Sequence, residues 1–145
     1  MAVSLESVGA APLTQWDPSL ATGIDRIDRQ HRELMTALQD FQKAVQEGSG
    51  LRIVNGTVER MVRYTEDHFM LEESYMNHIK YPRLPSHRED HARLRARIRY
   101  LRQRLGEGDR EKALELSNHL CQYLRDHILK EDSAYAEFAR GGKTL

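Results

Sequence analysis

Four stretches of this sequence repeat apolar side chains in steps of three and four residues, the spacing that places them on one face of an α-helix. The stretches are separated by turn-forming segments at residues 48–50, at Pro82 and Pro85, and at residues 106–108. None of them alternates apolar and polar residues as a half-exposed strand does. The pattern therefore predicts an all-α fold, an antiparallel up-down-up-down four-helix bundle.

The chain is long enough, at 145 residues, for one domain with a single core. We expect the bundle over residues 23–140, preceded by an irregular N-terminal arm over residues 1–22 and followed by a tail over residues 141–145. The arm has two prolines and no sustained periodicity, and Trp16 can anchor it to the bundle.

Two helix starts can be located from capping residues. Ser86 and Glu89 have the spacing of a capping box and predict the start of the third helix. Asp109 is a candidate N-cap for the fourth helix. The positions of both caps agree with the limits of the apolar periodicity.

The overall charge is balanced, since 22 lysines and arginines face 22 aspartates and glutamates. We therefore expect no nucleic-acid partner, and no run of residues is apolar enough for membrane insertion. The first residues do not have the pattern of a signal peptide. Cys121, the single cysteine, excludes an internal disulfide and a thiolate-rich metal site. These features predict a cytoplasmic protein, and no further apolar stripe requires a second copy, so we expect a monomer.

The third helical stretch carries six arginines between residues 93 and 104. Because the apolar stripe continues between them, we interpret them as a solvated face whose aliphatic stems cover apolar edges. A docking surface for an acidic partner is the alternative hypothesis.

Several polar residues interrupt the apolar stripes where the bundle interior is expected: His31, His68, Glu72, His87, His91 and His127. A buried imidazole or carboxylate without a partner costs about one to several kcal/mol. A shared cation would satisfy all these groups together. With one cysteine and seven histidines available, such a site would consist of imidazoles and carboxylates.

The spacing of these residues supports a metal centre. His68 and Glu72 are four residues apart, as are His87 and His91, so each pair can point to one place from one helix face. Each pair alone is a weak signal, and a single His31 on an apolar face is more often a core histidine. Polar groups on all four stripes together indicate metal binding.

The fourth stretch leaves two alternatives open. Asp132 follows His127 by five residues, which in a regular helix are rotated by about 140° from a shared face. Either Asp132 faces solvent, or the backbone loosens after His127 and turns the carboxylate inward. Asp126 and Glu131 are competing carboxylates nearby.

The order and spacing of these residues resemble the hemerythrin family, in particular its bacterial single-domain members. The matching segments are GIDRIDRQHREL, HFMLEESYM, the YP loop, HREDH and DHILKEDSAYAEF. The resemblance implies two iron ions (Fe2+/Fe3+) joined by an oxo or hydroxo bridge. It assigns His87, His91 and His127 to one iron, His31 and His68 to the other, and Glu72 and Asp132 as bridges.

By the same resemblance, one iron keeps an open coordination position, which implies reversible binding of dioxygen for storage, transport or delivery, and no catalysis. We expect Leu34, Phe69 and Leu124 to wall the oxygen pocket and exclude water. A protein partner that receives the oxygen is possible. Two alternatives remain, namely an oxygen or redox sensor that acts through a partner and a di-iron enzyme that consumes peroxide or nitric oxide.

Overall fold

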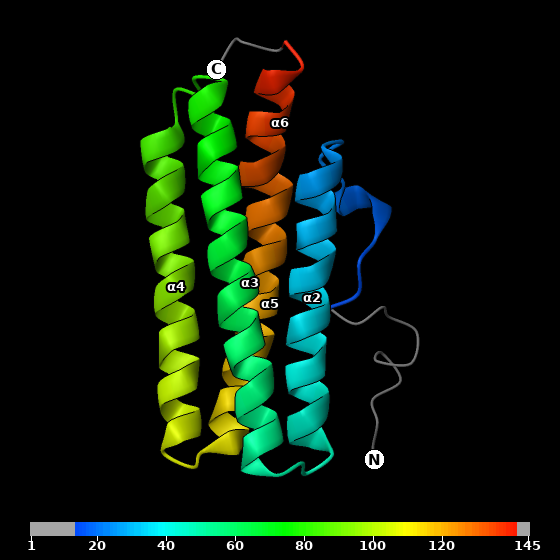
Figure 1. Cartoon of the computed structure of the whole chain (residues 1–145), viewed down its shortest axis with the longest axis vertical. Helices are drawn as coiled ribbons and strands as arrows, with labels where there is room; N and C mark the ends of the chain where they lie inside the picture. Colours follow the sequence, from blue (N-terminus) through cyan, green and yellow to red (C-terminus); the bar gives the residue numbers. More distant parts are fainter. Residues whose placement is uncertain (1–13, 142–145) are drawn as a thin grey trace.

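A computed structural model describes residues 14–141 of the chain. Figure 1 shows four long helices side by side, with the last one extended by a further helical segment. The long helices are α2 (Asp25–Gln46), α3 (Leu51–His78), α4 (Leu84–Gly106) and α5 (Arg110–His127). The shorter segments are η1 (Pro18–Leu20), a 3₁₀ helix, then η2 (Ile128–Asp132), a π-helical turn, and α6 (Ser133–Ala139). The prediction of an all-α four-helix bundle is confirmed.

Short turns join the antiparallel helices. Gly48 follows α2 with φ 71° and Gly108 follows α4 with φ 84°, backbone conformations that favour glycine over residues with a Cβ atom. After α5 the chain does not turn back, because η2 and α6 continue in the same column (Figure 1). The predicted fourth helix is therefore a continuous column of three segments, α5, η2 and α6.

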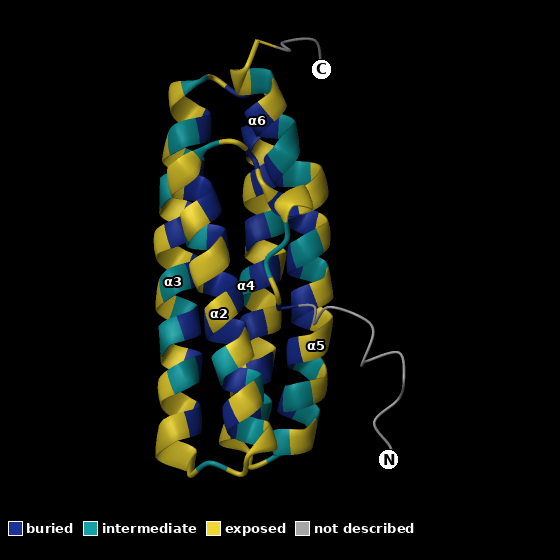
Figure 2. Cartoon of the chain, turned by 90° about the vertical axis from the view of Figure 1, so that its right-hand side faces the viewer, coloured by how far each residue is buried: buried dark blue, intermediate teal, exposed yellow. Residues whose placement is uncertain are grey.

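The buried residues lie along the inner faces of the helices (Figure 2), and the apolar ones among them form two clusters. The larger cluster includes Leu34, Phe69 and Leu124, and the smaller one includes Ile27 and Tyr135. Along α2, α3 and α4, and along the column from α5 to α6, the polar residues singled out in the sequence lie between members of the two clusters. The bundle therefore places a polar layer between two apolar layers.

The predicted capping box at Ser86 and Glu89 is wrong. Helix α4 begins at Leu84, and its N-cap, Arg83, makes no side-chain cap. Ser86 lies inside the first turn and donates a hydrogen bond from Oγ to the Arg83 carbonyl at 3.3 Å. Pro85 explains the earlier start, because a proline has no N–H to leave unsatisfied in the first turn.

The predicted cap at Asp109 is confirmed, since its Oδ1 accepts a hydrogen bond from the Lys112 backbone N–H at 3.0 Å. Asp109→Ala should lower the free energy of unfolding by about 1 kcal/mol, because this N–H loses its partner. Urea unfolding measures the change, and Asp109→Asn, which keeps an oxygen acceptor, is the matched control. Equal losses of stability in both variants would mean that the effect comes from the ion pair between Asp109 and Arg104 instead.

The described part of the arm packs against the bundle. Trp16 contacts the larger apolar cluster, and the Arg32 guanidinium lies 5.4 Å from its ring centroid. Asp17 accepts a hydrogen bond from Arg125 at 2.6 Å. The remainder of the predicted arm, up to residue 13, lies outside the described residues. Within residues 14–141, no helix combines the length and apolar character needed to span a membrane.

Candidate metal centre

The structure brings together all seven side chains that the sequence predicts as metal ligands. They are between 0 and 4% exposed. Helix α2 provides His31, α3 provides His68 and Glu72, α4 provides His87 and His91, and the column of α5 and η2 provides His127 and Asp132. Their ligand roles remain a prediction, but each lies where that prediction requires.

The potential ligand atoms form two groups, and within each group they lie within 4.8 Å of one another. One group combines three imidazoles with Glu72, and the other combines two imidazoles with Glu72 and Asp132. The members are Glu72, His87, His91 and His127 in the first group and His31, His68, Glu72 and Asp132 in the second. The two groups therefore share a carboxylate and differ in their number of histidines.

Each of the two carboxylates has one oxygen near each group. Glu72 Oε1 lies 2.9 Å from His91 Nε2, and its Oε2 lies 3.3 Å from His68 Nε2. Asp132 Oδ1 lies 3.1 Å from His127 Nε2, and its Oδ2 lies 2.9 Å from His31 Nε2. This arrangement is what two carboxylates need to bridge a pair of cations.

The donor atoms fit a cation better than they fit one another. The Nε2 atoms of His31, His87 and His127 and both oxygens of Asp132 are buried without a hydrogen-bond partner, although they approach each other closely. Such atoms cost free energy unless something else satisfies them. Nitrogen and carboxylate ligands suit iron, and they also suit zinc or copper. The two groups could therefore each hold a metal ion, and their geometry does not identify the element.

The pKa values of the histidines show that the neighbouring carboxylates favour a positive charge on the imidazoles. Burial lowers the pKa of His31, but the neighbouring Asp132 and Glu72 carboxylates outweigh it and raise that pKa to about 9. The pKa of His127 rises to about 11, because its carboxylate neighbours, led by Asp132, outweigh the effect of burial. Protons and cations therefore compete for these imidazoles, and metal binding would displace the protons.

Three histidines are oriented by hydrogen bonds from the opposite ring nitrogen. The Nδ1–H groups of His68 and His91 donate to Gln30 Oε1 at 2.8 Å and to Glu73 Oε2 at 2.7 Å. The Nδ1–H group of His127 donates to Asp90. These bonds leave Nε2 of each ring free to face the centre, and the acidic acceptors raise its basicity as a ligand.

Sequence reasoning missed Gln30, Glu73 and Asp90. Each directly precedes or follows a predicted ligand, which is the only available sequence signal. That signal is ambiguous, because Asp90 is adjacent to His91 in the chain but accepts from His127 on α5. Only the packing of the helices determines which ring each side chain reaches.

Tyr135 was also missed. Its hydroxyl donates a hydrogen bond to Glu72 Oε2 at 2.7 Å, and its side chain is fully buried. Burial, assisted by the nearby Glu72 charge, raises the pKa of Tyr135 far above its usual value, so the hydroxyl keeps its proton and remains a donor. Tyr135 therefore holds one oxygen of the shared carboxylate in place.

Asp132 reaches the centre because the backbone loosens after His127. Residues 128–132 form a π-helical turn, in which the Ser133 N–H bonds to the Ile128 carbonyl, five residues back. Of the two alternatives left by the sequence, solvent exposure of Asp132 is therefore wrong. The competing Asp126 is exposed and accepts a hydrogen bond from Gln122 instead.

The three predicted pocket residues, Leu34, Phe69 and Leu124, line one apolar cavity of about 20 Å³, here called the inner cavity. Its other lining residues are Leu38, Met61, Thr65, Leu94, Ile98 and Leu120. The Phe69 ring stacks on the His91 imidazole with centroids 3.8 Å apart, so the cavity adjoins the ligand layer. Its volume suits one small molecule, and its apolar lining disfavours water.

The histidines and the cysteine outside the predicted ligand set lie away from the centre or are inert. His78 and His119 are exposed. Cys121 is buried, and burial raises the pKa of its thiol to about 12, which keeps it protonated and unreactive. The structure thus agrees with the interpretation of Cys121 as a small core residue.

Most of the arginines on α4 already have partners within the chain. Arg95 and Arg102 pair with Glu66 and Glu59 of α3 at 2.8 and 2.6 Å, and the Arg97 guanidinium lies 4.2 Å from the Tyr123 ring centroid. Arg93 and Arg104 pair with Asp90 and Asp109. These contacts support the interpretation as a solvated face over that of a docking surface.

This chain is similar to known proteins along most of its length. The family model described as Hemerythrin HHE cation binding domain matches residues 22–139, which include all seven predicted ligands. The chain is 33% identical over 125 residues to a bacteriohemerythrin of Stenotrophomonas maltophilia, covering 86% of this chain and 80% of the relative. It is 30% identical, with the same coverage, to a bacteriohemerythrin of Pseudomonas aeruginosa. A myohemerythrin of Theromyzon tessulatum is 27% identical over 107 residues, 73% of this chain and 83% of the relative.

Proposed function

Because this chain belongs to the hemerythrin family, we propose that it binds dioxygen reversibly at a pair of non-heme iron ions and stores, carries or delivers it. The observation that carries this proposal is the asymmetry of the two ligand groups. One group contains three histidines and the other contains two. Glu72 and Asp132 each have one oxygen near each group. The group with fewer histidines is the one that would offer a coordination position to a small molecule.

These positions support the ligand assignment that the family resemblance implies. His87, His91 and His127 would hold one iron, His31 and His68 would hold the other, and Glu72 and Asp132 would bridge them. When bound, the iron pair supplies the binding position for dioxygen and the electrons that hold it there. Five neutral imidazoles against two carboxylates favour holding oxygen over activating it, since carboxylate-rich bundles stabilise the higher oxidation states.

The protein surroundings would make the binding reversible. Hydrogen bonds from Nδ1 of His68, His91 and His127 fix the rings, so the ligand positions need not rearrange. The apolar lining of the inner cavity disfavours water. Water there would supply protons that release the oxygen in reduced form and leave the iron oxidised.

Anaerobic reduction of the iron-loaded protein, followed by addition of dioxygen and its removal under vacuum, tests the proposal. Absorption spectroscopy should show a new band with oxygen and complete return of the reduced spectrum without it. Irreversible oxidation on the first exposure would contradict reversible binding. Sustained consumption of peroxide or nitric oxide would favour the enzyme alternative.

Leu124→Asn should accelerate the spontaneous oxidation of the oxygenated protein, because an amide in the inner cavity attracts water. A barrier lower by about 1 to 2 kcal/mol corresponds to a rate about 5- to 30-fold higher. Decay of the oxygenated absorption band measures the rate, and Leu124→Met, which keeps the cavity apolar, is the control. An unchanged rate of oxidation in Leu124→Asn would mean that Leu124 does not keep water out of the inner cavity.

A further inference from the structure

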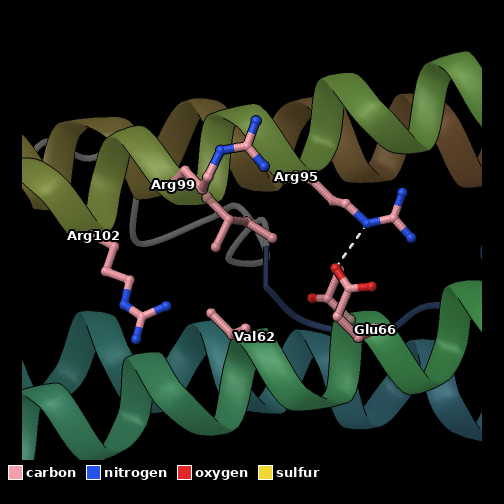
Figure 3. Close-up of a pocket in the computed structure, with 7 residues that line it drawn as sticks. Val62, Glu66, Arg95, Arg99 and Arg102 are labelled. Carbon is pink, nitrogen blue, oxygen red and sulfur yellow. Dashed lines mark hydrogen bonds and ion pairs between the residues drawn. The ribbon is translucent and has the colours of Figure 1, made fainter.

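A surface pocket of about 60 Å³ lies on the seam between α3 and α4, and Figure 3 shows its lining. We call it the seam pocket. Its lining residues are Val62, Thr65, Glu66, Arg95, Ile98, Arg99 and Arg102. Two of them, Thr65 and Ile98, also line the inner cavity. The solvent side and the ligand side of the bundle are therefore separated here by the same pair of side chains.

This partition consists of two side chains that are almost fully buried. Thr65 is 6% exposed and Ile98 is 7% exposed, so each reaches the surface while also bordering the inner cavity. The Thr65 hydroxyl donates to the Met61 carbonyl at 2.7 Å within its own helix. Its polar group is thereby satisfied, and Thr65 and Ile98 are the two side chains that border both spaces.

The outer rim of the seam pocket consists of long side chains. Arg95 bonds to Glu66 at 2.8 Å (Figure 3), while Arg99 has no ion-pair partner among the described residues. The Arg95 guanidinium lies 4.9 Å from the centroid of Phe69, the ring that stacks on His91. Partly exposed side chains of this kind change rotamer within picoseconds to nanoseconds. The rim therefore delays the entry of a small molecule less than the buried partition of Thr65 and Ile98 does.

We propose that small uncharged molecules reach the metal centre through the α3–α4 seam, and that Ile98 and Thr65 are the gate between the seam pocket and the inner cavity. The identity of the physiological ligand as dioxygen rests on the proposed function, but the route does not. A gate lies outside the binding position, so it changes the rates of uptake and release together and leaves the equilibrium affinity unchanged.

Substitutions at Ile98 test the route in both directions. Ile98→Phe should slow uptake and release of a small ligand about fivefold or more, since close-packed partitions respond to added volume, and Ile98→Ala should accelerate both. Ala96→Phe adds bulk to an exposed position on the same helix and should leave both rates unchanged. Thermal unfolding of every variant shows whether the bundle remains folded.

Two readouts separate the route from the proposed function. Exchange of xenon with the oxidised, iron-loaded protein, measured by NMR, reports passage into the inner cavity without any oxygen binding. Stopped-flow mixing of the reduced protein with dioxygen gives the uptake and release rates of the proposed ligand. Altered xenon exchange with no oxygen binding would support the route and refute the function.

The competing route passes Leu124, which borders the inner cavity from α5 and is as exposed as Ile98. If the seam is the gate, Leu124→Ala should accelerate xenon exchange less than Ile98→Ala does, because it leaves the partition between the two spaces in place. A greater acceleration in Leu124→Ala, combined with parent rates in both Ile98 variants, would overturn the proposal.

Discussion

Replacement of Glu72 by alanine is expected to abolish the binding of both metal ions. Its two carboxylate oxygens face different groups of ligands, Oε1 toward His91 and Oε2 toward His68, so one substitution removes a ligand from each proposed ion. Loss of an outer hydrogen-bond partner of a ligand typically costs about 10- to 100-fold in metal affinity, and loss of a shared ligand should exceed about 100-fold. Metal analysis after loading with iron measures the result.

Two matched variants on the same helix calibrate this loss. Glu73→Gln weakens the acceptor of the His91 Nδ1–H bond, together with an exposed pair with Arg88, and should reduce affinity by about 10- to 100-fold. Glu66→Gln alters a surface pair with Arg95 and should leave the metal content unchanged. If Glu72→Ala bound as much iron as the parent protein, the carboxylate would not be a bridge and the assignment of the centre would fail.

The fold was predictable because its main determinant is periodic. Apolar steps of three and four residues define a helix face over many turns, and glycines such as Gly48 and Gly108 provide the turns that side chains disfavour. The start of α4 was not predictable from the Ser86 and Glu89 spacing, because two local rules conflict there. A proline is tolerated in the first turn of a helix, and α4 therefore begins just before Pro85 and not at the predicted capping box.

The candidate centre was predictable where its members lie on regular helices. His68 with Glu72 and His87 with His91 follow directly from the four-residue spacing. The outer hydrogen bonds were not predictable, because Asp90 and Tyr135 reach residues 37 and 63 positions away in the chain. Contacts at that separation depend on the rotation and height of each helix, which no local pattern contains.

Inserting one residue into η2 and deleting one residue from it should have opposite effects on metal binding. A π turn is an α-helix with one extra residue, and here the extra residue makes the five-residue step from His127 to Asp132 point inward. Insertion of an alanine after Lys130 makes the step six residues, and because the π turn absorbs one of them, this corresponds to five residues of regular helix, about 140° from a shared face. The insertion should therefore remove Asp132 from the centre and lower metal affinity by more than about 100-fold, beyond the loss from an outer partner.

Deletion of Lys130, an exposed residue, should instead preserve the metal pair. The remaining step of four residues is the regular spacing of one helix face, so Asp132 still points inward and Tyr135 still reaches Glu72. Iron content and thermal unfolding of the two variants measure the contrast, and since both change the length by one residue, a general disturbance of the helix would affect them alike. Loss of iron in both would mean that the bent geometry of η2 is itself required, and retention in both would exclude Asp132 as a ligand.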